Sequence, residues 1–532
     1  MSLLTQLFRT KSLDDLVAET QEEGHQLKKA LGPWNLVALG VGAVIGAGIF
    51  ATIGTAAGGQ TVAPFRPGAG PGLMISFVIT AIVCAFTALC YAEFASMVPV
   101  SGSAYTYSYA TLGELVAWII GWDLIIEYAI GNVAVAISWA NYFVTFLETF
   151  PGVHVPRWLA TDYQTATKIP GLIASAPHIF GVAIVFNIFA LLIVTFITIV
   201  LVWGVRESAR FNAVMVLLKL VVLAFFVIVC IPAVKPENWR PIAPNGWTGI
   251  MTGAAIIFFA YIGFDAVSTT AEECRNPKRD MPIGIIGSLI VCTIIYVIVA
   301  AVFTGVIPFP ALKHLLATEQ AEPLAMAMKY AGKNAASIRV VAIGSVIAHT
   351  AVLLVFQLGQ PRIFFAMARD GLLPPWIAKV HPKYRTPHVA TILTGVLVGV
   401  ASMFTSLEQM VALTNIGTLF AFMLVCIGII VLRIKDPLRP RSFRVPGPWW
   451  FLPILGAVSC VGLAYYLERG SWERLGIWLV IGLVVYFFYS YGHSRLRNPS
   501  PALAGAPKRE VLHDFNPEQQ LPSSDVDEEP KK

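Results

Sequence analysis

One lysine stands out as a group able to do chemistry, because it lies within an otherwise apolar run. Lys219 sits in residues 211–222 (FNAVMVLLKLVV). A charge at the centre of a bilayer costs about 2.5–3.5 kcal/mol on insertion scales, so the side chain is expected to face the interior of a helix bundle. Removal from water favours the uncharged amine, which suits a proton carrier. A fixed contact with a carboxylate or a backbone carbonyl is the alternative interpretation.

Two carboxylates also lie within apolar runs. Glu127 is in residues 124–131 (LIIEYAIG). It fits a proton path or the recognition of a cationic side chain, and equally a packing carboxylate hydrogen-bonded to a neighbouring helix. Asp265 follows Gly263 in residues 258–265 (FFAYIGFD). An acidic side chain suits the start of a helix, so we predict that Asp265 caps a half-helix there.

The elements that must position these groups contain glycine at unusual density. Residues 40–50 (GVGAVIGAGIF) include Gly46 and Gly48, and Gly263 lies inside a later apolar run. Small residues also allow close helix packing, which is the alternative explanation. Interruptions in corresponding helices of two repeats, however, indicate a transporter's binding site. Free amides suit a carboxylate and free carbonyls suit an ammonium, so two matched breaks would fit a zwitterionic amino acid.

Composition indicates a protein whose solvent is lipid. The 532 residues are 56% hydrophobic and 13% charged, and the net charge of +6 does not indicate a nucleic-acid partner. The seven cysteines show no metal-ligand spacing, and no catalytic dyad or nucleotide loop appears. We therefore expect no metal, no cofactor and no enzymatic activity. Twelve apolar stretches are predicted to span the membrane as helices: residues 35–58, 73–98, 114–147, 178–203, 211–232, 250–272, 283–307, 337–367, 388–405, 409–432, 450–468 and 473–492.

The expected organisation follows from these spans. Residues 1–33 form a cytoplasmic N-terminal segment, 34–232 a first five-helix repeat, 250–432 a second, inverted repeat and 450–492 two more helices. Residues 493–532, rich in Pro, Ser and acidic side chains, read as a disordered cytoplasmic tail. Lys and Arg are more frequent in the loops on the N-terminal side, which predicts both termini in the cytoplasm. The expected location is a cell membrane, the inner membrane if the source is bacterial.

Five ordered sequence blocks resemble a known superfamily. They are residues 40–50, residues 90–96 (CYAEFAS) with 99–105 (PVSGSAY), residues 258–267, residues 272–283 (EECRNPKRDMPI) and residues 367–374 (MARDGLLP). Over about residues 30–490 the chain resembles the amino acid–polyamine–organocation superfamily, in particular the bacterial homologues of its cationic amino acid transporter branch.

The resemblance implies an all-α fold of the LeuT type, with the first and sixth helices broken, and alternating access. It implies that the substrate carboxylate rests on amides around Ala47 and Gly48, beside Ile49. It places the substrate amino group on carbonyls near Val44, Ile45, Phe259, Ala260 and Ile262. Lys219 matches the lysine that replaces a sodium ion in proton-coupled relatives. Several relatives have Thr or Ser where this chain has Ala47, which leaves the substrate's side chain undefined.

The leading hypothesis is proton-coupled symport of L-amino acids, small neutral or cationic. Exchange of one amino acid for another is the alternative, and a membrane nutrient receptor or scaffold is the alternative outside transport. The expected partners are the amino acid, protons and the lipid bilayer, with room for a small membrane subunit.

Overall fold

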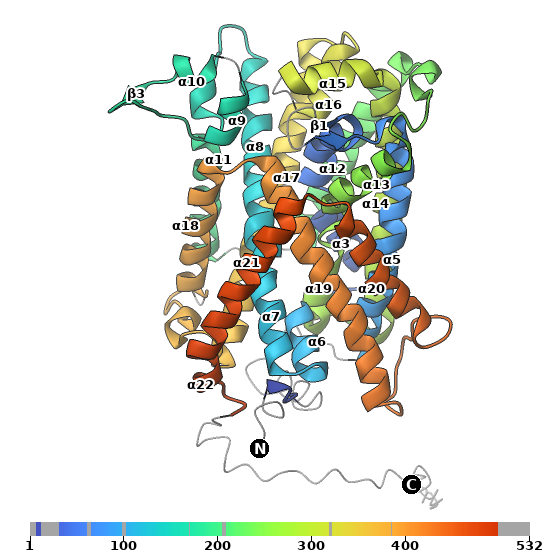
Figure 1. The fold of residues 1–532 in the computed structure, drawn as a ribbon, viewed down its shortest axis with the longest axis vertical. Helices are drawn as coiled ribbons and strands as arrows, with labels where there is room; N and C mark the ends of the chain where they lie inside the picture. Colours follow the sequence, from blue (N-terminus) through green and yellow to red (C-terminus); the bar gives the residue numbers. More distant parts are fainter. Residues whose placement is uncertain are drawn as a thin grey trace, which may run out of the picture.

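The computed structural model describes residues 7–11, 31–60, 65–97, 103–169, 171–204, 209–318, 322–384 and 386–497. Most of the expected N-terminal segment and nearly all of the expected tail lie outside these residues. The described chain is helical, apart from two two-stranded hairpins. Its long helices run roughly along one direction and form a bundle (Figure 1).

Nine helical segments in the described chain are long and apolar enough to cross a membrane. Several combine shorter helices, as in the run from α7 to α8. They are Pro33–Gly58 (α3, η1, α4), Gly70–Met97 (η2, α5), Glu114–Glu148 (α7, η3, α8), Ala213–Ala233 (within α12 and η5), Gly246–Ser268 (α13, η7 and part of η8), Pro277–Val306 (α14), Ala335–Arg369 (α17), Leu407–Lys435 (α19) and Arg469–His493 (α21, η10, α22).

Three further apolar helices are shorter and complete the set of twelve stretches expected from the sequence. They are α11 (Ile188–Trp203), α18 (His388–Phe404) and α20 (Phe451–Tyr465). At 1.5 Å per residue, a helix of 16 residues extends about 24 Å, less than the roughly 30 Å of a hydrocarbon core. The structure therefore supports a polytopic membrane protein, with nine spans of full length among the residues that it describes.

The start predicted for the fourth span was wrong. Residues 178–183 form a hairpin of β3 (His178–Ile179) and β4 (Val182–Ala183), and α11 begins only at Ile188. The apolar residues before α11 therefore extended the hydrophobic pattern beyond the helix. Asn187 ends this extension, because its side chain caps α11 by accepting a hydrogen bond from the amide of Ala190 at 3.1 Å.

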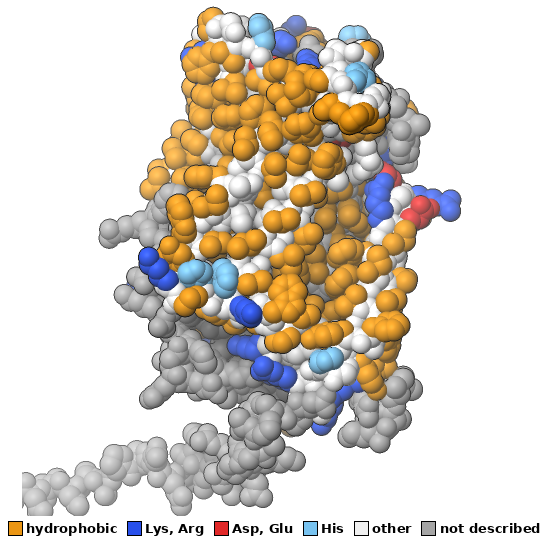
Figure 2. Space-filling model, turned by 90° about the vertical axis from the view of Figure 1, so that its left-hand side faces the viewer, with side chains coloured by type: hydrophobic (Ala, Val, Ile, Leu, Met, Phe, Trp, Pro, Cys, Tyr) orange, Lys and Arg blue, Asp and Glu red, His pale blue; other side chains and the backbone are white. Residues whose placement is uncertain are grey.

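Lipid-facing surface explains the apolar composition. Leu192 and Phe196 on α11, and Val396 and Leu397 on α18, are more than half exposed. Apolar side chains cover most of the face in Figure 2, on the side of the bundle where α11 and α18 lie. In water this much exposed apolar surface would mark an interaction site, whereas in a bilayer it is the solvated face.

The remaining elements lie mostly at the two ends of the bundle. They are α6 (Ser103–Thr111), η4 (Arg157–Leu159), α9 (Tyr163–Lys168), α10 (Leu172–Ser175), η6 (Pro236–Trp239), α15 (Phe309–Thr318), α16 (Pro323–Tyr330), η9 (Pro375–Ala378), β1 (Gly59–Gln60) and β2 (Arg66–Pro67). The antiparallel β1–β2 hairpin, α15 and α16 lie at the end opposite to α22 (Figure 1).

The two glycine-rich helices occupy the centre of the bundle. In the most apolar stretch of both Pro33–Gly58 and Gly246–Ser268, 89% of the residues are buried. The corresponding share in Arg469–His493 is 22%. Helix α3 (Pro33–Val44) packs against α14, α12 and η8, and α13 (Gly246–Ile257) packs against α5 and α4. The central position of these two segments puts their irregular parts out of contact with lipid, where non-helical backbone is tolerated.

Candidate functional site

The first central helix is interrupted where the glycines predict it. Helix α3 ends at Val44, and Ile45 has extended backbone angles (φ −75°, ψ 101°). The chain becomes helical again through Ala47 and the π-helical turn η1 (Gly48–Thr52), followed by α4 (Ile53–Gly58). The first amides of a helix have no acceptor within it, so the start of this second half-helix presents free N–H groups.

The second central helix is interrupted at Ile262 and Gly263. Helix α13 tightens into the 3₁₀ turn η7 (Phe258–Tyr261), and Ile262 is then extended (φ −61°, ψ 134°). Gly263 has φ 116°, a conformation that L side chains rarely adopt, and the 3₁₀ segment η8 (Phe264–Glu273) follows. This break exposes the last carbonyls of the first half-helix.

The two breaks touch each other through backbone. A Cβ built on Gly48 would overlap Ala260, lying 2.6 Å from its Cβ and 2.7 Å from its amide nitrogen. A Cβ on Gly263 would lie 2.9 Å from the carbonyl oxygen of Ala43. Glycine is required at both positions for this approach. The structure therefore brings the two predicted half-sites, residues 44–49 and 259–262, into one buried place.

A tyrosine joins the two sets of carbonyls. The Tyr296 hydroxyl, on α14, lies 3.0 Å from the carbonyl oxygen of Val44 and 3.0 Å from that of Ala260. One hydroxyl has one proton to donate, so the two carbonyls share it. Tyr296 was not predicted as a site residue from the sequence. A fully buried tyrosine in an apolar helix needs a partner for its hydroxyl, and that need was the available signal.

Lys219 reaches the same broken helix. Its side chain, on α12 (Ala209–Cys230), is 1% exposed, and Nζ donates a hydrogen bond to the carbonyl oxygen of Gly42 at 2.5 Å. Gly42 lies two residues before the end of α3. The Lys–carbonyl contact considered from the sequence is therefore present, and it ties Lys219 to the half-helix that ends at the break.

Three carboxyl groups gather on the side of the breaks toward α7. Glu127 lies in the π-helical turn η3 (Ile126–Ile130) and is 2% exposed, and its side chain adjoins Asp265 and Thr418. Asp123, one helical turn earlier on α7 (Glu114–Ile125), is fully buried and was missed from the sequence. Within the described residues, Glu127 Oε2 and both carboxylate oxygens of Asp123 and Asp265 accept no hydrogen bond.

The capping role of Asp265 stays a prediction. Gly263 occupies the cap position of η8, and no side chain makes a capping hydrogen bond there. Asp265 lies in the first turn of η8, where a negative charge still favours the helix start. Its buried carboxyl lies beside Glu127 and also close to the backbone amides of Gly263 and Ala266 at the start of η8.

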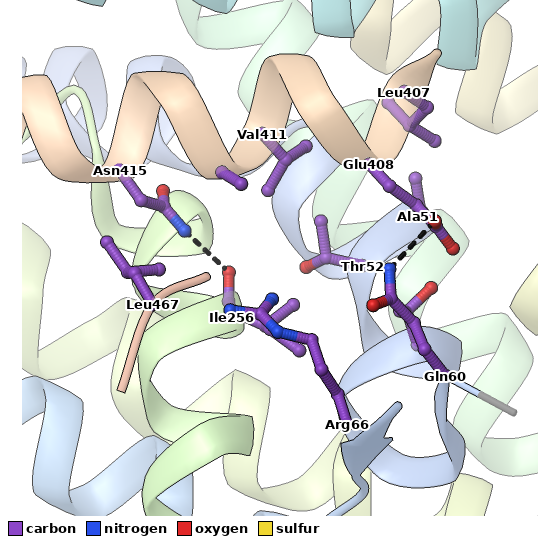
Figure 3. Close-up of a pocket in the computed structure, with 12 residues that line it drawn as sticks. Ala51, Thr52, Gln60, Arg66, Ile256, Leu407, Glu408, Val411, Asn415 and Leu467 are labelled. Carbon is purple, nitrogen blue, oxygen red and sulfur yellow. Dashed lines mark hydrogen bonds between the residues drawn. The ribbon is translucent and has the colours of Figure 1, made fainter. Parts of the chain in front are cut away.

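A pocket adjoins the breaks on the side toward β1. Twelve residues line it, among them Ala51 and Thr52 of η1 and Ile256 of α13 (Figure 3). The Thr52 hydroxyl donates to the carbonyl oxygen of Gly48 at 2.5 Å, so the pocket wall is bonded directly to the break. The Asn415 amide on α19 donates to the carbonyl oxygens of Ala255 at 2.8 Å and Ile256 at 3.1 Å, fixing the end of α13.

These features define a class of protein: a polytopic membrane transporter with two interrupted central helices and a buried site between them. The comparisons with known proteins agree with that class. The family model for amino acid permeases matches residues 31–494. A branched-chain amino acid permease of Bacillus subtilis is 46% identical over 490 residues, covering 92% of this chain and 99% of that protein.

Two further relatives differ in what their names say they carry. A methylthioribose transporter of Bacillus subtilis is 42% identical over 496 residues, which cover 93% of this chain and all of that protein. A vacuolar cationic amino acid transporter of Arabidopsis thaliana is 36% identical over 441 residues, or 82% of this chain and 68% of that protein. The chain belongs to the amino acid permease family. It is a multi-pass membrane transporter of amino acids and not an enzyme.

Proposed function

We propose that the chain is a proton-coupled L-amino acid symporter that works by alternating access in a LeuT-type fold. In this proposal residues 34–232 and 250–432 are two inverted five-helix repeats and residues 450–492 add two helices. The supporting observation is the contact between the two breaks, where Gly48 meets Ala260. Interruptions at matching places in two central helices are the arrangement that such repeats use to bind a substrate.

The proposed site binds both charged groups of an amino acid. The carboxylate lies on the amides of Ala47, Gly48 and Ile49 at the start of the second half-helix. The ammonium lies on carbonyls of residues 44–45 at one break and of residues 259, 260 and 262 at the other. When no ammonium is bound, the Tyr296 hydroxyl donates to two of these carbonyls, those of Val44 and Ala260. Substrate binding and the hydrogen bonds of Tyr296 are therefore linked.

Lys219 is the proposed proton carrier. Its ammonium is bonded to Gly42, on the half-helix whose end contributes carbonyls to the site. Loss of the proton leaves a neutral amine with two N–H donors and one lone pair. This weakens the bond to the carbonyl, because a charged donor makes the stronger hydrogen bond. Protonation of Lys219 thus favours one position of α3, and the carboxyl groups of Glu127 and Asp265 supply the remaining proton path.

The proposed substrate has a small neutral or a cationic side chain. A small neutral amino acid would place its side chain beside Phe259 and Ile262, two buried apolar residues at the second break. A cationic one would place its charge toward Glu127 and Asp265, since Glu127 Oε2 and both Asp265 carboxylate oxygens accept no hydrogen bond within the described residues. The proposal also places both termini in the cytoplasm and the protein in a cell membrane, and it leaves a small membrane subunit as a further partner.

A binding screen followed by flux tests this function. Melting of the purified protein is measured with each common L-amino acid and with methylthioribose, since a ligand that binds the native state raises the Tm. Proteoliposomes are then given an inward proton gradient. Accumulation of the binding amino acid that disappears when the gradient is collapsed supports symport. Uptake that needs internal amino acid and survives the collapse indicates exchange, and binding without flux indicates a receptor.

A further inference from the structure

The pocket beside the breaks carries opposite charges that the proposed central site does not use. Arg66 of β2 and Glu408 of α19 both line it, and their side chains extend into it from different elements (Figure 3). Its wall is otherwise largely apolar, formed by residues that include Leu407, Val411 and Leu467. A cation, an anion and an apolar wall around one cavity match the parts of an α-amino acid.

The Arg66 guanidinium has donors to spare. Within the described residues it donates a single hydrogen bond, to the carbonyl oxygen of Tyr466, which is long at 3.4 Å, whereas a guanidinium carries five N–H donors. Burial lowers the pKa of Arg66, while the charges of Glu468 and Glu408 act in the opposite direction. The group is therefore partly withdrawn from water, yet it stays ionised and suits a bidentate contact with a carboxylate.

The acidic side of the pocket has unused acceptors. Glu408 Oε2 accepts a hydrogen bond from Gln60 Nε2 at 2.8 Å and lies 3.7 Å from Lys168 Nζ. The same amide's oxygen, Gln60 Oε1, is buried and accepts no hydrogen bond within the described residues. A carboxylate and a neighbouring unpartnered carbonyl oxygen are the groups that an ammonium requires.

The position of the pocket gives this chemistry a use. Two of its residues, Ala51 and Thr52, belong to the half-helix that starts at the first break, and Ile256 lies just before the second. We propose that the pocket is a separate binding site for an α-amino acid on its way to the breaks, with Arg66 receiving the carboxylate and Glu408 the ammonium. This inference rests on the proposed transport of amino acids, but it concerns a second place on the path.

Thiol protection tests the site directly. Thr55 lines the pocket and is partly exposed, and all seven native cysteines are buried, so a Thr55→Cys variant offers one reactive thiol. Labelling by a charged maleimide is timed with and without L-alanine, L-leucine or L-arginine. The experiment is repeated with Gly48→Val, which fills the contact between the breaks and removes the central site.

We expect at least one of these amino acids to slow labelling several-fold in both backgrounds. Arg66→Gln and Glu408→Gln should each abolish the protection. Arg474→Gln is the matched control and should keep it, because Arg474 is a nearby arginine that does not line the pocket and lies 3.5 Å from Glu468. Two analogues of the protecting amino acid should not protect: the amine that lacks the carboxylate, and the carboxylic acid that lacks the amino group.

Two results would overturn the proposal. One is protection that vanishes with Gly48→Val although the Tm of that variant shows a folded protein. The other is protection that Arg66→Gln and Glu408→Gln leave unchanged. If Gly48→Val does not fold, the KM of transport by Arg66→Gln decides. A transit site predicts a higher KM in this variant. A purely structural role of Arg66, through its hydrogen bond to the carbonyl oxygen of Tyr466, predicts an unchanged KM. Failure of the wild-type protein to bind any amino acid would instead refute the proposed function.

Discussion

Gly48 and Ala260 meet so closely that a methyl group on Gly48 would lie 2.6 Å from the Ala260 side chain. Each residue belongs to a different interrupted helix, and their contact is through backbone. Space for a substrate between the two breaks must therefore come from a relative movement of the two half-helices. Substitutions at this contact should consequently act on binding before they act on folding.

Gly48→Val is expected to abolish amino acid binding. The added side chain must displace the backbone of residue 260, which cannot move as a flexible side chain would. Isothermal titration of the purified variant should show at least a tenfold loss of affinity. Gly476→Ala on α21 is the control, because a Cβ there meets nothing within 4 Å and binding should be unchanged. Normal affinity in Gly48→Val would contradict the proposed site.

Lys219→Ala should abolish proton-driven accumulation while leaving a folded protein. The variant removes the ammonium that donates to Gly42, and with it the proposed carrier. Counterflow, which exchanges labelled for unlabelled substrate without a gradient, should persist at a measurable rate. The coupling role of Lys219 is wrong if the variant still accumulates substrate with the pH dependence of the wild-type protein.

Tyr296→Phe should lower the Tm, and saturating substrate should restore part of the loss. Two buried carbonyls lose their donor, at a cost of about 1–3 kcal/mol. The ammonium of a bound amino acid would supply a new donor to them. Tyr261→Phe is matched to it, since the Tyr261 hydroxyl donates to the carbonyl of Phe77 at 3.0 Å and not to the proposed ammonium carbonyls. Equal recovery in both variants would argue against the proposed ammonium position.

Glu322 should make the protein less stable as the pH rises. Its carboxyl is 4% exposed beside α16, at the end of the bundle, and burial raises its pKa from 4.5 to about 8, with the Asn141 side chain acting the other way. Between those values the folded state holds a proton that the unfolded state has lost. Stability therefore falls by up to about 1.4 kcal/mol per pH unit and levels off above pH 8.

Glu322→Gln removes the titrating carboxyl, and its Tm measured against pH checks the effect. The Tm of the variant should exceed that of the wild-type protein most at pH 8 and least near pH 5. Glu473→Gln serves as the comparison, because Glu473 is an exposed residue on α21 that pairs with Arg469. A constant difference between Glu322→Gln and wild type across this range would show that Glu322 stays ionised in the folded protein.

Local sequence signals predicted the breaks because glycine and the backbone it permits are local. The interruptions at Ile45 and at Gly263 fall where the glycine runs predicted them. The predicted start of the fourth span failed because hydrophobicity alone does not separate a helix from an apolar hairpin. A turn signal at Gly181 was present between the two strands, where the chain has φ 80°.

Partners across helices could not be predicted from the sequence. Tyr296 lies 36 residues from Ala260 and 252 from Val44, so neither contact leaves a local pattern. Asp123 is one turn from Glu127, yet its approach to α19 depends on Gly417, where an added Cβ would lie 3.1 Å from Asp123 Oδ1.

The hydrogen bond from Lys219 to Gly42 has a consequence for energy conversion. If the amino acid favours one arrangement of α3, it must shift the affinity of this lysine for its proton by the same factor with which the proton shifts the affinity for the amino acid. The coupling free energy between proton and amino acid then depends on the last few residues of α3, from Gly42 to the break. A substitution there could weaken the coupling without contacting either the proton or the amino acid.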